Sequence, residues 1–318
     1  MSLCLVTATV VMIPIVYHPI YSKLDLPAEH RYPISKYQLL HQALLERQQQ
    51  DHNWLAQFSI VEPSALSIEQ VQKVHSPDYI QALFSNQLPA AKMRRIGFPW
   101  SEQLIERTLT SAGGTCLSVE LAIEHGIAIH LSGGYHHAHY DFGSGFCLIN
   151  DLVLAAKRAL EFPQIDKVLI IDSDVHHGDG TATLCANEDD IVTLSFHCDK
   201  NFPAKKPHSD IDIALARETG DLEFLDHFYS VVQTAVNLHR PDLIIYDAGV
   251  DIHIDDELGY FNVSTQGLYQ RDCFLLRLAQ QQGLPIACVV GGGYRSVHQE
   301  LVPMHMQLLN AAFDSQFS

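Results

Sequence analysis

Acidic and histidine residues alternate in one short segment that directly follows an apolar run, Asp172-Ser173-Asp174-Val175-His176-His177-Gly178-Asp179-Gly180. Because side chains of extended backbone alternate with period two, Asp174 and His176 would point to one side and could bind one metal ion. Asp251 follows another apolar run and offers a further carboxylate. Two Asp oxygens and one His nitrogen leave an open position on a tetrahedral ion, as hydrolytic zinc sites require. Each residue alone could equally cap a helix or be solvated, but the segment as a unit favours a metal site.

Two adjacent histidines, His136 and His137, follow a Gly-Gly pair after a further apolar run. They could bind metal, cap the sheet or shuttle protons. Hydrolysis needs a base to take a proton from water and an acid to protonate the leaving amine, and an imidazole can do either near neutral pH. Asp172 and Asp179 are spare carboxylates that could orient these imidazoles and raise their basicity.

A glycine turn, Gly291-Gly292-Gly293-Tyr294-Arg295, follows the last apolar run. It could cradle phosphate, but it lacks the spacing and the lysine of a P-loop. The hydroxyl of Tyr294 could instead donate a hydrogen bond to a polarised carbonyl and its tetrahedral oxyanion. Alone, this turn could equally be structural, and the other motifs favour the functional interpretation.

The elements that must position these residues are short runs rich in Val and Ile, which predict buried strands. These runs cover residues 13–17, 128–131, 168–171, 191–196, 243–246 and 286–290. Helix starts are predicted at Ser35, Ser67 and Ser76. Longer helices are predicted over 104–123, ending at Gly126, and over 222–238, with Leu222 and Leu238 on the apolar face. Alternating strands and helices predict an α/β fold, a parallel sheet with helices on both faces and ligands at the carboxyl ends of its strands.

Composition limits the class of protein. The 318 residues are 47% hydrophobic and 18% charged, which excludes a disordered or fibrous protein. A formal charge of −17 argues against stable nucleic-acid binding and would attract cationic substrates. Seven cysteines without a Cys-x-x-Cys pair favour a reducing compartment, and the apolar amino-terminal run is too short to span a membrane. We therefore expect a cytoplasmic protein with a single domain over residues 1–318, of which 1–11 are an extension or a mis-set start.

Five motifs in this order and spacing resemble the histone deacetylase superfamily, with its acetoin-utilisation and acetylpolyamine amidohydrolase relatives: GGYHHA, GSGFCLIND, DSDVHHGDG, DAGVD and GGGYR. The similarity covers nearly the whole chain. The segments YHPIYSKLDLPAEHRYPISKY and IGFPWS are most similar to the class IV branch and its bacterial members. The resemblance implies the arginase/deacetylase-like variant of the α/β fold.

The resemblance also implies a role for each matching position. The metal ligands would be Asp174, His176 and Asp251, usually for zinc and sometimes for ferrous iron. The catalytic residues would be His136 and His137, their carboxylate partners Asp172 and Asp179, and the carbonyl-polarising Tyr294. The substrate-binding residues would be Gly145, Phe146, Phe202, Leu258 and Gly292, although both phenylalanines could equally be core residues. Arg31 resembles an arginine near the acetate exit, which a helix-start salt bridge explains nearly as well. A structural potassium site would use Asp172, Asp174, His176, Ser195 and Phe196.

Two departures from the pattern affect substrate choice. Leu258 occupies a tunnel-floor position where class I relatives carry methionine, and no residue matches their rim aspartate. The run Asp255-Asp256-Glu257 could receive a cationic substrate, but a solvated loop is the better interpretation.

The sequence therefore predicts a metal-dependent amidohydrolase that removes an acyl group, such as acetyl, from lysine side chains of proteins or from similar amines. Water activated by the ion and deprotonated by His137, with His136, would attack a carbonyl polarised by the ion and Tyr294. The alternatives are an acetylpolyamine deacetylase, a two-manganese ureohydrolase, which the motifs disfavour, and a homologue that binds a partner without turnover. The physiological substrate, the acyl length, the native metal and the oligomeric state do not follow from the sequence.

Overall fold

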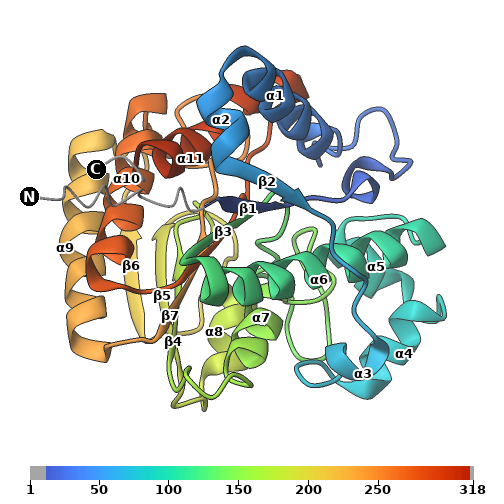
Figure 1. The fold of residues 1–318 in the computed structure, drawn as a ribbon. Coiled ribbons are helices and arrows are strands. Elements are labelled where there is room, and N and C mark those ends of the chain that lie inside the picture. Colours follow the sequence, from blue (N-terminus) through green and yellow to red (C-terminus); the bar gives the residue numbers. More distant parts are fainter. Residues whose placement is uncertain (1–11, 316–318) are drawn as a thin grey trace, which may run out of the picture.

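Eight parallel strands form one sheet through the centre of the molecule (Figure 1). The strands are β1 (Ile13–Val16), β2 (Phe58–Val61), β3 (Ile127–His130), β4 (Val168–Asp172), β5 (Ile191–Cys198), β6 (Ile211–Leu215), β7 (Leu243–Asp247) and β8 (Ile286–Val289). Their order across the sheet is β2-β1-β3-β8-β7-β4-β5-β6. The computed structural model describes residues 12–315, so the predicted extension at 1–11 lies outside the described residues.

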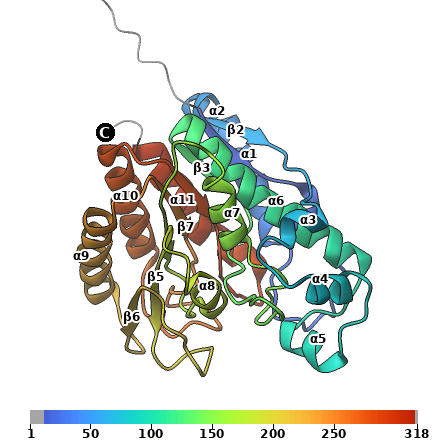
Figure 2. The ribbon, with the colours of Figure 1, turned by 90° about the horizontal axis from the view of Figure 1, so that it is seen from below.

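Helices lie on both faces of this sheet, which confirms the predicted fold class. They are η1 (Pro19–Ser22), α1 (Lys36–Gln50), α2 (His52–Gln57), α3 (Ile68–Val71), α4 (Pro77–Phe84), α5 (Ala90–Ile96), α6 (Glu102–His125), α7 (Asp151–Ala159), α8 (Asp179–Cys185), α9 (Asp221–His239), α10 (Thr265–Gln282), η2 (His298–Leu301) and α11 (Val302–Ser315). Figure 2 shows α9, α10 and α11 on one face and α6 and α7 on the other. Among the described helices, none is both long and apolar enough to cross a membrane.

The longest helix, α6, has clear start and stop signals. The side chain of Ser101 accepts a hydrogen bond from the backbone N–H of Leu104, and Gly126 ends the helix with φ +85°. Within the helix, a Cβ on Gly114 would lie 2.4 Å from the Nε2 atom of His130. Glycine there lets α6 approach β3 closely, and so fixes the strand that precedes the His136-His137 pair.

Three details of the predicted helices differ from expectation. Ser67 forms the predicted capping box, whereas the side chains of Ser35 and Ser76 make no capping hydrogen bond. The hydroxyl of Ser35 instead bonds to the Nδ1 atom of His298. Leu222 and Leu238 are 91% and 70% exposed, so they do not belong to the buried face of α9. The predicted Leu225, Val232 and Val236 do lie on that face, together with Phe224 and Phe228.

The four central strands β3, β8, β7 and β4 bring their carboxyl ends together. In the register of the sheet, Asp172 at the end of β4 lies opposite Asp247 at the end of β7, and Asp247 lies opposite Val289 of β8. Val289 in turn pairs with His130 of β3. The loops that leave these strands therefore start at one level and can share a site.

Candidate metal centre and active site

The predicted metal ligands come together after β4 and β7. The Nδ1 atom of His176 lies 2.8 Å from Asp174 Oδ1 and 3.1 Å from Asp251 Oδ2, and all three side chains are buried. Ligand atoms of the three residues lie within 4.8 Å of one another. A Cβ on Gly292 would lie 2.1 Å from an oxygen of Asp174 and 2.3 Å from one of Asp251, so glycine keeps the space beside the carboxylates clear. One nitrogen and two carboxylate oxygens suit a zinc or ferrous ion.

Electrostatics of these residues also favour a bound cation. Burial and the charge of Asp174 raise the pKa of Asp251 to about 8. Burial alone would lower the pKa of His176, but the hydrogen bonds that its imidazole donates to the carboxylates of Asp174 and Asp251 raise it to about 10. Two buried carboxylates around one imidazole thus need positive charge between them, and a divalent ion can supply it in place of the proton.

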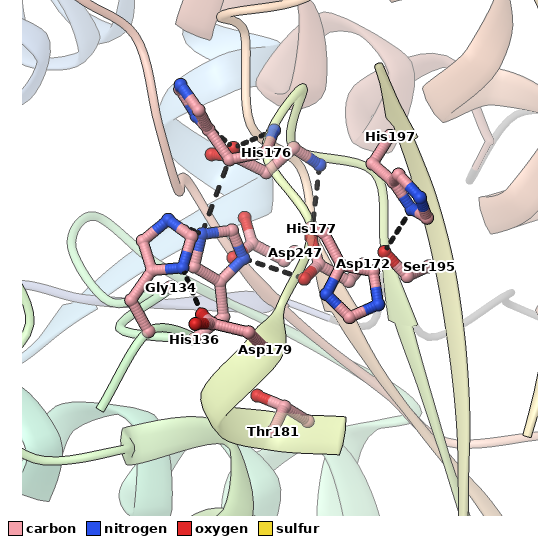
Figure 3. Close-up of polar contacts among 12 residues, drawn as sticks. Gly134, His136, Asp172, His176, His177, Asp179, Thr181, Ser195, His197 and Asp247 are labelled. Atoms are coloured by element: carbon pink, nitrogen blue, oxygen red, sulfur yellow. Dashed lines mark hydrogen bonds and ion pairs between the residues drawn. The ribbon is translucent and has the colours of Figure 1, made fainter. Parts of the chain in front are cut away.

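The two predicted catalytic histidines lie beside the metal ligands, each paired with a carboxylate. Figure 3 labels His136, Asp172, His176 and Asp179 in this region. The Nδ1 atom of His136 is 2.7 Å from Asp172 Oδ2, and that of His137 is 2.6 Å from Asp179 Oδ1. Their Nε2 atoms lie 3.1 Å apart, and His136 Nε2 is 3.9 Å from Asp174 Oδ1. Carboxylates at Nδ1 orient both rings so that both Nε2 atoms face the metal ligands.

The environments of the two histidines give them different pKa values. Burial would lower the pKa of His136, but the carboxylates of Asp172 and Asp174 raise it well above 6.5. Burial, followed by the neighbouring His136, lowers the pKa of His137 to about 3. The pair therefore carries one proton near neutral pH, which leaves a neutral imidazole at His137.

Tyr294 closes the other side of the site. Its ring centroid lies 6.2 Å from that of His176, and burial followed by the charge of Asp174 raises the pKa of its hydroxyl well above 10. The hydroxyl therefore keeps its proton and can donate it in a hydrogen bond.

Asp256 holds the turn that carries Tyr294. Its carboxylate accepts hydrogen bonds from the backbone N–H groups of Tyr294 at 2.6 Å and of Leu258 and Gly259 at 2.8 Å each. Our interpretation of 255–257 as a solvated loop is thus wrong for Asp256, because two donors of its own loop and one of the glycine turn bind its carboxylate. Its exposed neighbours Asp255 and Glu257 agree with that interpretation.

Phe202 lies beside His137, whereas Phe146 packs in an aromatic cluster with Tyr32, Phe98 and Tyr294. The ring of Phe202 lies 4.8 Å from that of His137 and is 43% exposed, so it is not a core residue. Phe146 lies 6.1 Å from Tyr294 and has an unusual φ of +66°, next to Gly145 at +51°. A Cβ on Gly145 would contact both His137 and Phe202, which places its backbone inside the site. Its carbonyl oxygen accepts a hydrogen bond from the Cys147 thiol.

The same family emerges from comparison with known proteins. A family model described as the histone deacetylase domain matches residues 30–309. The chain belongs to the histone deacetylase family. The resemblance found in the motifs is thus confirmed for the family, which supports a deacetylase-type hydrolase.

Individual relatives of the family span bacteria and eukaryotes. An uncharacterised protein of Picosynechococcus sp. is 40% identical over 301 residues, which cover 95% of this chain and 98% of that protein. Histone deacetylase B of Dictyostelium discoideum is 33% identical, with 71% of this chain and 57% of that protein covered. The acetoin utilization protein AcuC of Staphylococcus aureus is 29% identical, with 76% and 67% covered.

The buried cation near the glycine turn is Lys36 rather than Arg31. Arg31 is exposed on the loop before α1. Lys36 is 3% exposed, and its Nζ atom donates to the carbonyl oxygens of Gly291 at 2.8 Å and Gly293 at 3.4 Å. The role of Arg31 near the acetate exit stays a prediction. Position 36 was overlooked because a lysine in the first turn of a helix ordinarily faces solvent.

Asp247 is a second residue that sequence reasoning missed. It is fully buried, and neither carboxylate oxygen has a hydrogen-bond partner among the described residues. A Cβ on Gly134 or Gly291 would come within 2.5 Å of its oxygens, so two glycine turns make room for it. Burial, followed by the charges of Asp172 and Asp174, raises its pKa well above 3.8. The motif DAGVD contained this signal, since its first residue ends the strand.

The remaining predicted residues lie around this centre. The carbonyl oxygen of Leu258 accepts a hydrogen bond from Asn201, the residue before Phe202, at 3.0 Å. Ser195 lies opposite Asp172 in the β4–β5 pairing. The side chain of Phe196 packs on Phe228 in the core, so only its backbone could take part in the predicted potassium site.

His139 adds a further partner that the motif GGYHHA did not reveal. Its Nε2 atom lies 3.0 Å from the second oxygen of Asp179, so this carboxylate orients two imidazoles. A third histidine two residues after the pair was the available signal.

Proposed function

We propose that this chain is a metal-dependent deacylase that hydrolyses the amide of acetyl-lysine or of other acyl-lysine side chains. The observation that carries the proposal is the convergence of three groups: the carboxylate-paired histidines, the Asp174, His176 and Asp251 ligand set, and Tyr294. The His137 and His176 rings are 6.0 Å apart, and the His176 and Tyr294 rings are 6.2 Å apart. A carbonyl placed there would contact a base, an electrophile and a hydrogen-bond donor together.

A zinc or ferrous ion held by the three ligands would polarise the carbonyl and acidify a water molecule. His137 would take the proton of that water at Nε2, because its pKa of about 3 keeps it neutral. The protonated His136 would balance the charge and return a proton to the leaving amine. Tyr294 would donate a hydrogen bond to the carbonyl oxygen as negative charge develops. Water thus supplies OH to the acyl carbon and H to the amine.

Substrate would enter between Phe146 and Phe202. Two aromatic walls suit an apolar four-carbon stem, and the Gly145 carbonyl would accept a hydrogen bond from the substrate amide N–H. Leu258, Gly292 and Lys36 would complete the binding site and its inner end. We place a structural potassium ion at the backbone of residues 172–176 and 195–196, close to these loops.

An acetylpolyamine substrate is the alternative, supported by the charge of −17, which would attract a cationic amine. The same charge opposes stable nucleic-acid binding. The described cysteines are free thiols, which supports a reducing compartment such as the cytoplasm.

A turnover screen tests the proposal. Zinc-loaded and iron-loaded protein would be offered acetyl-lysine peptides, longer acyl-lysine peptides and acetylpolyamines, with Asp251→Ala as the inactive control. We expect release of free amine from acyl-lysine peptides that depends on the ion. Preference for acetylpolyamines would select the alternative, and no turnover of any of them would leave a homologue that binds without hydrolysis.

A further inference from the structure

A second cluster of metal-ligating side chains lies at β5 and β6, outside the proposed catalytic centre. It consists of His177 from the loop after β4, His197 from β5 and Asp212 from β6. Ligand atoms of these three residues all lie within 4.8 Å of one another. His177 is fully buried and His197 is 2% exposed. Two buried imidazoles and one carboxylate are an unusual set to place together without a ligand.

The contacts within the cluster direct the His177 ring toward Asp212. The Nε2 atom of His177 lies 3.1 Å from Asp212 Oδ1, and the two imidazole rings are perpendicular at 4.6 Å. The other ring nitrogen of His177, Nδ1, is buried and lacks a hydrogen-bond partner within residues 12–315. The polar contacts of this ring are therefore all on the side of the carboxylate.

His197 is arranged as a neutral ligand. Its Nδ1 atom lies 3.1 Å from the hydroxyl oxygen of Ser195 (Figure 3). A hydroxyl can accept a hydrogen bond from Nδ1–H, which leaves the lone pair on Nε2. The neutral imidazole is the form that binds metal.

The solvent side of the cluster offers a fourth donor. The Asp212 carboxylate is 24% exposed, and the backbone N–H of Ser209 holds its Oδ2 atom at 3.0 Å. His208 is 99% exposed, and its Nδ1 atom lies 3.9 Å from the same Oδ2 atom. This exposed side chain would have to rotate to bring a third imidazole to the cluster.

We propose that His177, His197 and Asp212 form a second metal site, which binds a divalent transition ion of the zinc type with His208 as the fourth ligand. Three imidazoles and one carboxylate match the tetrahedral donor sets that zinc accepts. The competing explanation is a buried His–Asp pair that needs no ion. An ion here would link the loop after β4 to strands β5 and β6. Through His208 it would also hold the loop after β5, which carries Phe202. The proposal does not depend on the proposed deacylase activity.

Metal counting on the full chain tests this site. Chelator-treated protein would be titrated with Zn²⁺, desalted and measured for zinc per chain by mass spectrometry. We expect two ions in the wild type and one in Asp212→Asn, in His197→Gln and in Asp251→Ala, which loses the other site. Asp210→Asn is the matched control, because Asp210 lies beside the cluster but bonds to Thr193. It should keep two ions.

Cobalt gives a second readout that is independent of catalysis. Co²⁺ bound by tetrahedral nitrogen and oxygen ligands absorbs visible light, so Asp251→Ala should retain a cobalt spectrum and Asp251→Ala with Asp212→Asn should lose it. Circular dichroism checks that each variant folds, and His197→Gln, which keeps a partner for Ser195, replaces Asp212→Asn if that variant does not fold. One zinc ion in the wild type, or two in a folded Asp212→Asn variant, would overturn the proposal.

Discussion

The ammonium group of Lys36 lies 2.8 Å from the carbonyl oxygen of Gly291, and so joins the start of α1 to the glycine turn that leads to Tyr294. The same ammonium lies 5.8 Å from the centre of the Tyr294 ring. The buried ammonium needs these carbonyl oxygens as hydrogen-bond partners, because water does not reach it. The turn is therefore held in the conformation that presents them. Lys36 therefore helps to position Tyr294 through its hydrogen bonds to the preceding glycine turn.

Replacing this lysine should change how stability depends on pH. Burial lowers the pKa of Lys36 from 10.5 to about 8, so between these pH values the unfolded chain binds a proton that the folded chain has lost. Folded stability from this group therefore rises with pH across that window, by about 3 kcal/mol for a pKa change of this size. Lys36→Met should abolish the rise, as measured by denaturant unfolding of metal-free protein. Parallel stability curves for wild type and variant would contradict the buried charge.

Asp251→Asn should separate metal binding from folding. The pKa of about 8 means that Asp251 is mostly protonated in the metal-free chain at neutral pH, and asparagine imitates that form. We expect the free energy of unfolding of the metal-free variant to stay within about 0.5 kcal/mol of wild type. Zinc at a 100-fold excess over Kd should stabilise the wild type by about 2.7 kcal/mol and the variant far less. Turnover should nearly vanish. Undiminished zinc occupancy at the Asp174–His176 centre would remove Asp251 from the ligand set.

His136→Asn and His137→Asn should each retain zinc while turnover falls by roughly 10²–10⁴-fold, because general acid or base help is lost. Asp172→Asn should act more mildly, since it alters His136 through one hydrogen bond of 2.7 Å. Metal analysis and kcat on the same preparations measure both effects. Wild-type rates in the two histidine variants would refute the proton-transfer role.

Tyr294→Phe should lower kcat by roughly 10²–10³-fold with little change in zinc content or KM, as for loss of an oxyanion-hole donor. Tyr260→Phe is the matched control, because Tyr260 is 42% exposed and should tolerate loss of its hydroxyl. If Tyr294 only packs under the glycine turn, both variants will turn over at the wild-type rate.

The central strands could be predicted because they are buried on both faces and are therefore continuously apolar. The two edge strands could not. In β2 only Phe58 is buried and Ile60 is 38% exposed, so four residues carry little pattern. In β6 the strand includes Asp212, whose carboxylate bonds to His177. The residue pattern of an edge strand is determined by contacts with neighbouring side chains more than by burial of a whole sheet face.

The convergence of the candidate catalytic motifs was predictable because their residues are adjacent in sequence and follow strands. Lys36 and Asp247 were not, because each acts through burial that only the tertiary fold creates. The burial of Asp256 was missed for the same reason. Its three backbone partners meet only when its loop folds and packs against the glycine turn that carries Tyr294. Sequence spacing thus identified the side chains that converge at the candidate site. It missed the buried side chains that pack beside this site.

The left-handed backbone of Phe146 restricts which residues can occupy this position, so the two proposed aromatic walls should differ in how freely they vary among relatives. Its φ of +66° is maintained by hydrogen bonds from Gly145 N–H to the Arg95 carbonyl at 3.2 Å and from its own N–H to the Ile96 carbonyl at 2.7 Å. Such a conformation excludes β-branched residues and tolerates few others. Phe202 sits on an exposed loop without that restriction. Relatives that diverge toward bulkier acyl groups should therefore vary at position 202 and leave position 146 nearly unchanged.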